Sequence, residues 1–357
     1  MSVPHREDRG PLRILDANAN RAREALRVME EAARFLLDDS RLAGTLKSDR
    51  HALRAALAGA GDLAAGRDVG GDVGRTLTTP AEGERDTVVA VVAAAGGRAS
   101  EALRALEEYG KAVPGVDAAA IEAIRYRGYA VAAELATRLR VAAQAKDRRA
   151  QLQAHPWRVC VLLDRAACRL PWERLLAAVL DAGADAIQVR EKQTPSGPLL
   201  AHAREVVRRV ERRAAVVVND RPDLALLSGA DGVHLGQDDV GVADARRVLG
   251  PAALVGVSTT SLCELAAAVA DGADTVGLGP MFPTATKPGK AVAGVAYAEA
   301  ALRRHPGLPH LAIGGITPAN AGGLAAAGVR GVAVAASVTG AADPAAAVHG
   351  LLEALAA

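Results

Sequence analysis

The spacing of hydrophobic residues changes once along the chain. Up to about residue 149, apolar side chains recur every three or four positions, as expected for helices. One such series is Leu26, Met29, Ala33 and Leu37. From residue 158 on, short β-branched runs alternate with helical stretches, and a polar stretch, 146–157, separates the two patterns. We therefore predict a helical domain over residues 1–149 and a second domain over residues 150–357.

The predicted helical domain contains an internal repeat. The pattern R-A-x-E-A-L-R-x-x-E-E occurs at residues 21–31 and again at residues 98–108. Such a repeat predicts two pseudo-equivalent helices that pack against each other, as an old duplication would leave. A loop rich in Gly and Thr, residues 66–87, separates the copies, and a long Ala-rich helix is expected over residues 116–146. Asn18 or Asn20 is expected to cap the first helix.

Candidate strands dominate the second domain. They lie near residues 158–164, 185–191, 214–220, 231–236, 254–258, 275–280, 310–315 and 331–337. Helical stretches separate them, so about eight β/α units occupy roughly 200 residues, which is the number that closes a (β/α)8 barrel. An open doubly wound sheet is the alternative, but no G-x-G-x-x-G opens its first helix. We predict an α/β chain with a C-terminal (β/α)8 TIM barrel and an N-terminal, mainly α-helical domain.

Composition limits the partners and the compartment. The net charge is +2 with acids and bases interspersed, which predicts neither a nucleic-acid partner nor a membrane surface. No apolar run approaches the ~20 residues of a membrane helix, and the first residues do not resemble a signal peptide. The three cysteines lack metal-ligand spacing and fit a reducing compartment. We expect a cytoplasmic protein, and a homo-oligomer is left open.

Polar residues gather where the predicted strands end. In a barrel, the carboxyl ends of the strands face the active site. The polar residues in this position are Gln188, Arg190, Lys192, Asn219, Asp220, Gln237, Asp238, Asp239, Ser258, Thr284, Thr286 and Lys287. Because cationic donors stand beside carboxylates, we expect a phosphoryl group chelated by Mg²⁺, which prefers hard oxygen ligands. His234 lies inside a strand and is expected to be structural.

Small residues follow the last two predicted strands. Gly314–Thr317 and Ala335–Ser337 each lead into a helix, which is typical of the phosphate seat of this fold. The site therefore has two anion-binding halves, one suited to a monophosphate and one to a diphosphate. No Cys or Ser with a paired base lies between them, so covalent catalysis is not expected.

Six segments of the second domain resemble the thiamine-phosphate synthase family, in family order and at family spacing, over about residues 158–357. They are QVREK, VVVNDRPDLAL, ADGVHLGQDD, GVST, VGLGPMFPTATKP and AIGGITPANA. The resemblance implies a Mg²⁺-dependent transferase acting on small phosphorylated substrates. It would join a hydroxymethylpyrimidine diphosphate to a thiazole phosphate and release pyrophosphate.

The resemblance also implies roles for individual residues. The pyrimidine diphosphate would be held by Gln188, Val189, Arg190, Glu191, Lys192, Asn219, Ser258 and Lys287. The thiazole phosphate would be held by Thr284, Ala285, Thr286, Gly315, Ala335 and Ala336. Mg²⁺ would be held by Asp220 and Asp239. Arg190, Lys192 and Lys287 would stabilise charge developing on the leaving pyrophosphate. Ala336 is a departure, because many relatives carry Ser there.

The first domain resembles a helical domain of the ThiD2 type that is fused in front of some thiamine-phosphate synthases. The resemblance covers about residues 12–149 and implies a pyrimidine-phosphate kinase that would use ATP. The candidate phosphate ligands are Asn18, Asn20, Arg21, Arg98 and the loop Thr76–Thr79. There is no Walker loop and no protein-kinase signature, so a non-catalytic dimerisation or docking module is the alternative.

Two other functions remain open for the barrel. A thiazole tautomerase would be an isomerase that needs neither diphosphate nor metal, and a catalytically silent barrel would only bind ligands. The joint presence of Arg190, Lys192, Asp220, Asp239 and Lys287 argues against both, because neither function requires a diphosphate half.

Overall fold

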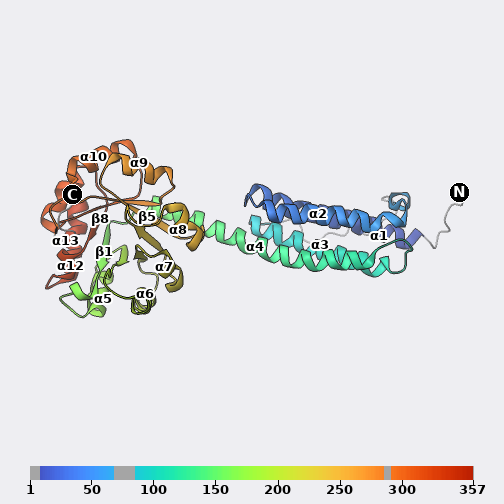
Figure 1. The fold of residues 1–357 in the computed structure, drawn as a ribbon, viewed down its shortest axis with the longest axis horizontal. Helices are drawn as coiled ribbons and strands as arrows, with labels where there is room; N and C mark the ends of the chain where they lie inside the picture. Colours follow the sequence, from blue (N-terminus) through green and yellow to red (C-terminus); the bar gives the residue numbers. More distant parts are fainter. Residues whose placement is uncertain (1–8, 68–84, 285–290, 357) are drawn as a thin grey trace. The chain divides into compact units, whose positions relative to one another are not determined.

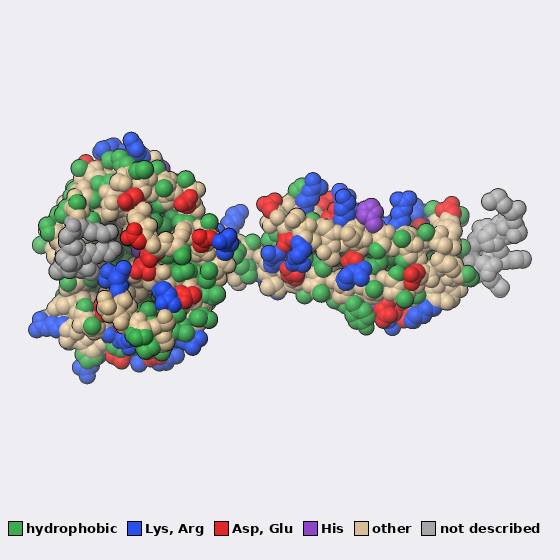
Figure 2. Space-filling view, in the orientation of Figure 1, with side chains coloured by type: hydrophobic (Ala, Val, Ile, Leu, Met, Phe, Trp, Pro, Cys, Tyr) green, Lys and Arg blue, Asp and Glu red, His purple; other side chains and the backbone are tan. Residues whose placement is uncertain are grey.

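The structure, a computed structural model, describes residues 9–67, 85–284 and 291–356. The chain divides into two compact units, Met1–Ala143 and Gln144–Ala357 (Figure 1). The domain boundary that the sequence predicts, between residues 149 and 150, lies six residues further along and stays a prediction. In the ranges described, no helix is both long enough and apolar enough to span a bilayer. On the face visible in Figure 2, acidic and basic side chains are interspersed over each unit.

The first unit is helical, as the sequence predicts. Its elements are α1 (Arg9–Phe35), α2 (Ser40–Leu57), η1 (Ala58–Ala60), η2 (Leu63–Gly66), α3 (Val88–Gly110) and the first part of α4 (Ala118–Ala154). Helices α1 and α3 carry the two copies of the repeat and pack against each other, which confirms that expectation. The predicted cap is wrong: Asn18 and Asn20 lie inside α1, because the helix already begins at Arg9. The side-chain amide of Asn18 donates to the Ile14 carbonyl at 2.9 Å.

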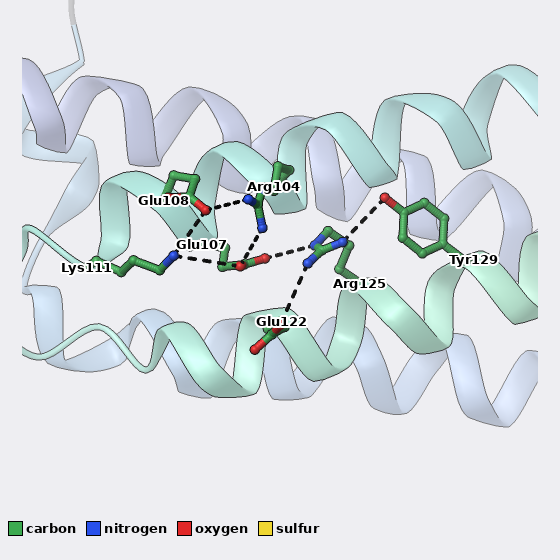
Figure 3. A network of polar contacts seen from close by, with 7 residues as sticks. All are labelled: Arg104, Glu107, Glu108, Lys111, Glu122, Arg125 and Tyr129. Carbon is green, nitrogen blue, oxygen red and sulfur yellow. Dashed lines mark hydrogen bonds and ion pairs between the residues drawn. The ribbon is translucent and has the colours of Figure 1, made fainter.

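The repeat extends to the ion pairs between helices. Glu30 of α1 binds Arg50 of α2 at 2.7 Å. At the equivalent place in the second copy, Glu107 of α3 points toward Arg125 of α4 and accepts from it at 2.8 Å (Figure 3). The helix pairs α1–α2 and α3–α4 are therefore held by the same kind of contact. A duplication that included both helices explains this similarity.

Helix α4 continues through the polar stretch that the sequence suggested as a break. It ends at Ala154 rather than near Lys146. Residues 144–154 belong to the second unit, where Leu152 is buried. Arg149 donates to Asp274 at 2.7 Å, and Arg148 lies 3.5 Å from Asp231. The sequence did not reveal that the helix continues here, because the partners of these arginines lie some 80 to 125 residues further along the chain.

The second unit is the predicted (β/α)8 barrel. Within the described residues, parallel strands pair in chain order and β1 closes on β8. The strands are β1 (Val159–Leu163), β2 (Ala186–Val189), β3 (Ala215–Asn219), β4 (Gly232–Leu235), β5 (Leu254–Thr259), β6 (Thr275–Leu278), β7 (His310–Ile313) and β8 (Val332–Val334). The helices around them are η4 (Arg165–Ala167), α5 (Trp172–Asp181), α6 (Ser196–Val210), α7 (Pro222–Ser228), α8 (Val242–Leu249), α9 (Leu262–Ala270), α10 (Gly294–Arg304), α11 (Pro318–Ala326), α12 (Ala336–Thr339) and α13 (Pro344–Ala356). Aliphatic side chains fill the layer between strands and helices, and a smaller cluster that includes Cys160 and Leu311 fills the barrel interior.

A Gly-Ala-Asp sequence recurs at the amino end of the barrel. Its aspartates, Asp185, Asp231 and Asp274, directly precede β2, β4 and β6. Each carboxylate accepts a hydrogen bond from the backbone N–H of a valine in the preceding strand, at 2.8 to 3.1 Å. Each glycine has a positive φ, between 75° and 88°, which favours glycine. These contacts tie neighbouring strands at the end opposite to the one where the predicted site lies.

Candidate active site

A cavity of about 430 Å³ opens at the carboxyl ends of the barrel strands. Polar side chains from successive strands and loops line it, among them Gln188, Arg190, Asn219, His234, Ser258, Thr259, Thr260 and Thr284. Small residues from the last two strand ends line it as well, among them Gly314, Gly315, Ala335, Ala336 and Ser337. The predicted site residues from β2, β3, β5, β7 and β8 therefore meet in one hollow.

The end of β2 presents its residues alternately. Gln188 and Arg190 line the cavity, as the sequence predicts. Val189 packs in the hydrophobic layer between strands and helices, and Glu191 is buried against Arg165, so both side chains are directed away from the cavity. Lys192 binds the carboxylate of Asp220 at 2.9 Å. The regular strand ends at Val189, two residues before the end of the predicted one.

Asp220 and Asp239 lie next to each other. The backbone of Asp220 has φ +62°, and its N–H donates to the His234 carbonyl at 2.9 Å. One oxygen of Asp239 accepts from the Gly236 N–H at 2.6 Å. Burial raises the pKa of Asp239, and the neighbouring carboxylate of Asp220 raises it further. Such a pair of carboxylates attracts a cation.

The donor set fits Mg²⁺, since both groups are hard oxygen ligands. Within ranges 9–67, 85–284 and 291–356, no group of three or more His, Cys, Asp or Glu side chains could hold a metal ion. Mg²⁺ at Asp220 and Asp239 would therefore depend on water and substrate oxygens for its remaining ligands.

His234 lines the cavity, which the sequence interpretation missed. Its Nε2 lies 2.9 Å from the Ser258 hydroxyl. The ring has room because glycines occupy the neighbouring strands: a Cβ on Gly256 would lie 2.6 Å from the ring Nδ1. Glycines at 256 and 277, in the two strands that follow, are the signal that could have revealed an inward-facing ring. Gln237 also reaches the site, because its amide donates to the Ser258 carbonyl at 2.6 Å.

The small residues after β7 and β8 have little room for side chains. Gly314 and Gly315 have φ of +102° and +64°, and a Cβ on Gly315 would lie 2.5 Å from the Pro283 carbonyl oxygen. Ser337, one residue after the unusual Ala336, has a buried hydroxyl without a hydrogen-bond partner in the part of the chain that the structure describes. The predicted residues Ala285, Thr286 and Lys287 lie outside the described residues.

The candidate phosphate ligands of the helical unit differ in their contacts. Asn18 and Asn20 bond within α1, the latter to Asp16 at 3.5 Å, and Arg21 and Arg98 are exposed. The loop Thr76–Thr79 lies outside the described residues.

Comparisons with known proteins agree with this geometry. The model of the thiamine monophosphate synthase family matches residues 159–338, and that of the ThiD2 family matches residues 13–134. The thiamine-phosphate synthase of Thermosynechococcus vestitus is 41% identical over 99% of this chain and 97% of its own length. That of Synechocystis is 40% identical over 95% of each chain.

A solved structure matches the barrel. It is the thiamine phosphate pyrophosphorylase from Pyrococcus furiosus, which is 32% identical, has a TM-score of 0.51, and covers 56% of this chain and 96% of its own. These two synthases are 41% and 40% identical to this chain over nearly its whole length, which establishes the family. The chain therefore belongs to the thiamine-phosphate synthase family, transferases of thiamine biosynthesis, and carries a ThiD2 family segment ahead of its barrel.

Proposed function

We propose that the barrel cavity couples a hydroxymethylpyrimidine diphosphate to a thiazole monophosphate, with Arg190, Lys192 and Lys287 on the departing diphosphate. The observation that carries the proposal is that Arg190, Asn219, Gly315 and Ala336 all line one cavity. A cationic end and a glycine-lined end of the same hollow suit two different phosphate groups.

The bond changes need no acid or base from the protein. The bond between the exocyclic carbon of the pyrimidine and the diphosphate oxygen breaks, and its electron pair leaves with pyrophosphate. The electron-rich aminopyrimidine carries the resulting positive charge. The thiazole nitrogen then donates its lone pair to that carbon and closes the C–N bond, so no proton is transferred. The chain contributes orientation and electrostatic stabilisation.

Arg190 and Lys192 act on the leaving group. Arg190 lines the cavity, and Lys192 stands beside the carboxylates through its contact with Asp220 at 2.9 Å. Cationic donors at this place stabilise negative charge as it builds on the pyrophosphate. Mg²⁺ held by Asp220 and Asp239 would supply further positive charge there. Gln188, Asn219 and Ser258 offer donors and acceptors for the pyrimidine and its first phosphate.

The thiazole phosphate binds at the glycine-lined end. Gly315, Ala335 and Ala336 allow the backbone to approach a phosphate closely, and Thr284 adds a hydroxyl donor. We infer that the hydroxyl of Ser337 donates to the thiazole phosphate next to Ala336, because its oxygen is buried and has no partner among the described residues.

The test supplies both phosphorylated substrates and Mg²⁺ to the purified protein and measures thiamine phosphate and pyrophosphate. The proposal expects equal amounts of the two products and no product in excess chelator. Product formed equally well in chelator would contradict the metal's role. A change in the thiazole phosphate without thiamine phosphate or pyrophosphate would favour chemistry of the tautomerase type.

For the helical unit we propose the kinase that its ThiD2 family match suggests, supplying the diphosphate to the barrel. The test supplies pyrimidine monophosphate, ATP, Mg²⁺ and thiazole phosphate. Thiamine phosphate from this mixture supports a kinase. Product only when the diphosphate is added supports the alternative of a non-catalytic oligomerisation module.

A further inference from the structure

Glu191 is a buried carboxylate in the middle of the diphosphate-binding segment. Its side chain is only 4% exposed. Its oxygens accept hydrogen bonds from the Arg165 guanidinium at 2.6 and 2.7 Å, from the Arg165 N–H at 3.2 Å, and from the Thr194 hydroxyl at 2.9 Å. A bidentate arginine with two further donors satisfies a buried carboxylate well, and such a group holds its surroundings in one geometry.

The hydrogen bonds of Glu191 lie just beyond the end of strand β2. The pairing of β2 with its neighbours ends at Val189. Beyond it, the Arg190 N–H still donates to the Leu163 carbonyl at 2.9 Å, and the next anchor is the side chain of Glu191. Because alternate residues of an extended segment point to opposite sides, holding Glu191 away from the cavity directs Arg190 toward it. Lys192 follows in a turn, where it binds Asp220.

The surroundings of Glu191 are buried and closely packed. The His202 ring, 1% exposed, places its Nε2 3.5 Å from the carboxylate and meets the edge of Trp172 at 4.6 Å between centroids. Burial lowers the pKa of His202, which keeps the ring neutral and leaves Arg165 as the principal counter-charge. Glu191 thus links η4, the loop before α6 and α6 itself at one point.

We propose that Glu191 is a positioning residue for catalysis, acting through Arg165 and Thr194 to fix Arg190 and Lys192 on the diphosphate of the substrate. This inference rests on the proposed function, because it needs Arg190 and Lys192 to bind that diphosphate. It assigns Glu191 a place behind the site rather than a contact with the substrate.

The test compares substrate-specific kinetics in the full chain. In E191Q, kcat/KM for the pyrimidine diphosphate should fall roughly 10- to 100-fold, since small displacements of catalytic groups have effects of this size. The inhibition constant of magnesium pyrophosphate should rise with it, whereas KM for the thiazole phosphate should stay within about twofold. A residue that only stabilised the fold would not separate the two substrates.

A double-mutant cycle tests whether Glu191 acts through Arg165. R165Q alone and the double variant E191Q/R165Q should lose about as much as E191Q, because the two residues act as one unit. T194V removes a single hydrogen bond and should lower kcat/KM for the pyrimidine diphosphate by a smaller factor. It can replace E191Q in the test if E191Q does not fold. D181N removes an exposed pair with Arg213 (2.7 Å) elsewhere on the barrel and should change nothing.

The outcomes separate the two proposals. If R190A loses activity but E191Q keeps full pyrophosphate affinity and kcat/KM, the positioning role is wrong. Equal weakening of both substrates in E191Q and T194V would also overturn it. If R190A is as active as the unaltered chain, the proposed function of Arg190 fails first, and the positioning role of Glu191 fails with it.

Discussion

At the scale of single residues, Arg190 and Lys192 differ in how they are held. Arg190 lines the cavity, whereas Lys192 binds Asp220 at 2.9 Å. In the proposed function, Lys192 would neutralise the carboxylates as well as the diphosphate, whereas Arg190 would act on the diphosphate. The two charges are not interchangeable, because only Arg190 can bind a phosphate through two parallel hydrogen bonds.

Substitution of Arg190 tests its proposed role on the leaving group. R190A should lower kcat by about 10²- to 10³-fold, since it removes a donor from the charge that develops on the leaving group. R190K should recover part of the loss. Steady-state kinetics with both substrates measure the effect, and circular dichroism checks that the barrel is intact. A loss confined to the KM of the thiazole phosphate would contradict the assignment.

The carboxylate pair should make the Mg²⁺ requirement depend on pH. Burial and the neighbouring Asp220 raise the pKa of Asp239, so a proton competes with the cation at higher pH than for an ordinary carboxyl group. The Mg²⁺ concentration at half-maximal rate should increase as the pH falls toward that raised value. D239N should need more Mg²⁺ at pH 8 and should lose most of this pH dependence. An unchanged titration in D239N would exclude the residue as a ligand.

Ser337 offers a matched pair of substitutions. S337A should raise KM for the thiazole phosphate by roughly tenfold, the effect of losing one hydrogen bond to a charged group. A336S should restore much of that loss in the S337A background. KM for the pyrimidine diphosphate should not change in either variant, and a change there would show that the hydroxyl serves the other half.

The sequence predicts some of these residues well and others poorly. Alternation along the second strand was enough to place Gln188 and Arg190 in the cavity, because the period of an extended chain is fixed by its geometry. The partner of Glu191 could not be read from its neighbours, since Arg165 comes from another strand end. His234 was missed because its space is made by glycines in other strands.

At the scale of elements, ion pairs with little exposure join the helices of the first unit. Glu107 and Arg125 are 5% and 7% exposed, whereas their counterparts Glu30 and Arg50 are 12% and 23% exposed. Local periodicity predicts the helices and the repeat predicts their packing. It does not predict the end of α4, because Arg148 and Arg149 are charged residues whose partners are remote in sequence.

Asp49 of α2 should destabilise the helical unit at neutral pH. It is 2% exposed; one oxygen takes both hydrogen bonds from Arg127, and the other has no partner among the described residues. Burial raises its pKa, and Arg127 offsets this only in part. The folded state therefore binds the proton more tightly than the unfolded chain, so stability is lost as the pH rises through the raised pKa.

The substitution D49N removes that ionisation. It should raise the stability of the helical unit by ~1 kcal/mol at pH 7, the size of a typical desolvation penalty. The gain should vanish near pH 3, where Asp49 is protonated in both states. Thermal denaturation at the two pH values measures the difference, and a destabilised D49N at pH 7 would show that the Arg127 contact outweighs burial.

At the scale of the whole molecule, the second unit includes the end of α4. Leu152 is buried there, and Arg149 binds Asp274 at 2.7 Å. A chain that begins at Gln144 should keep the full coupling activity with the diphosphate substrate. A chain that begins at Trp157 should melt about 5 °C lower, because it loses the burial of Leu152 and both arginine contacts. Equal melting temperatures would show that these contacts contribute nothing to the barrel.

The Gly-Ala-Asp contacts have a consequence for how this barrel can diversify. Asp185, Asp231 and Asp274 tie neighbouring strands at the amino end of the barrel through hydrogen bonds from side chain to backbone, and the cavity lies at the opposite, carboxyl end. Loops at the carboxyl end can therefore be exchanged or lengthened while the aspartate contacts at the amino end stay intact. A designer who wishes to give this scaffold a new substrate should keep those aspartates and vary the other end.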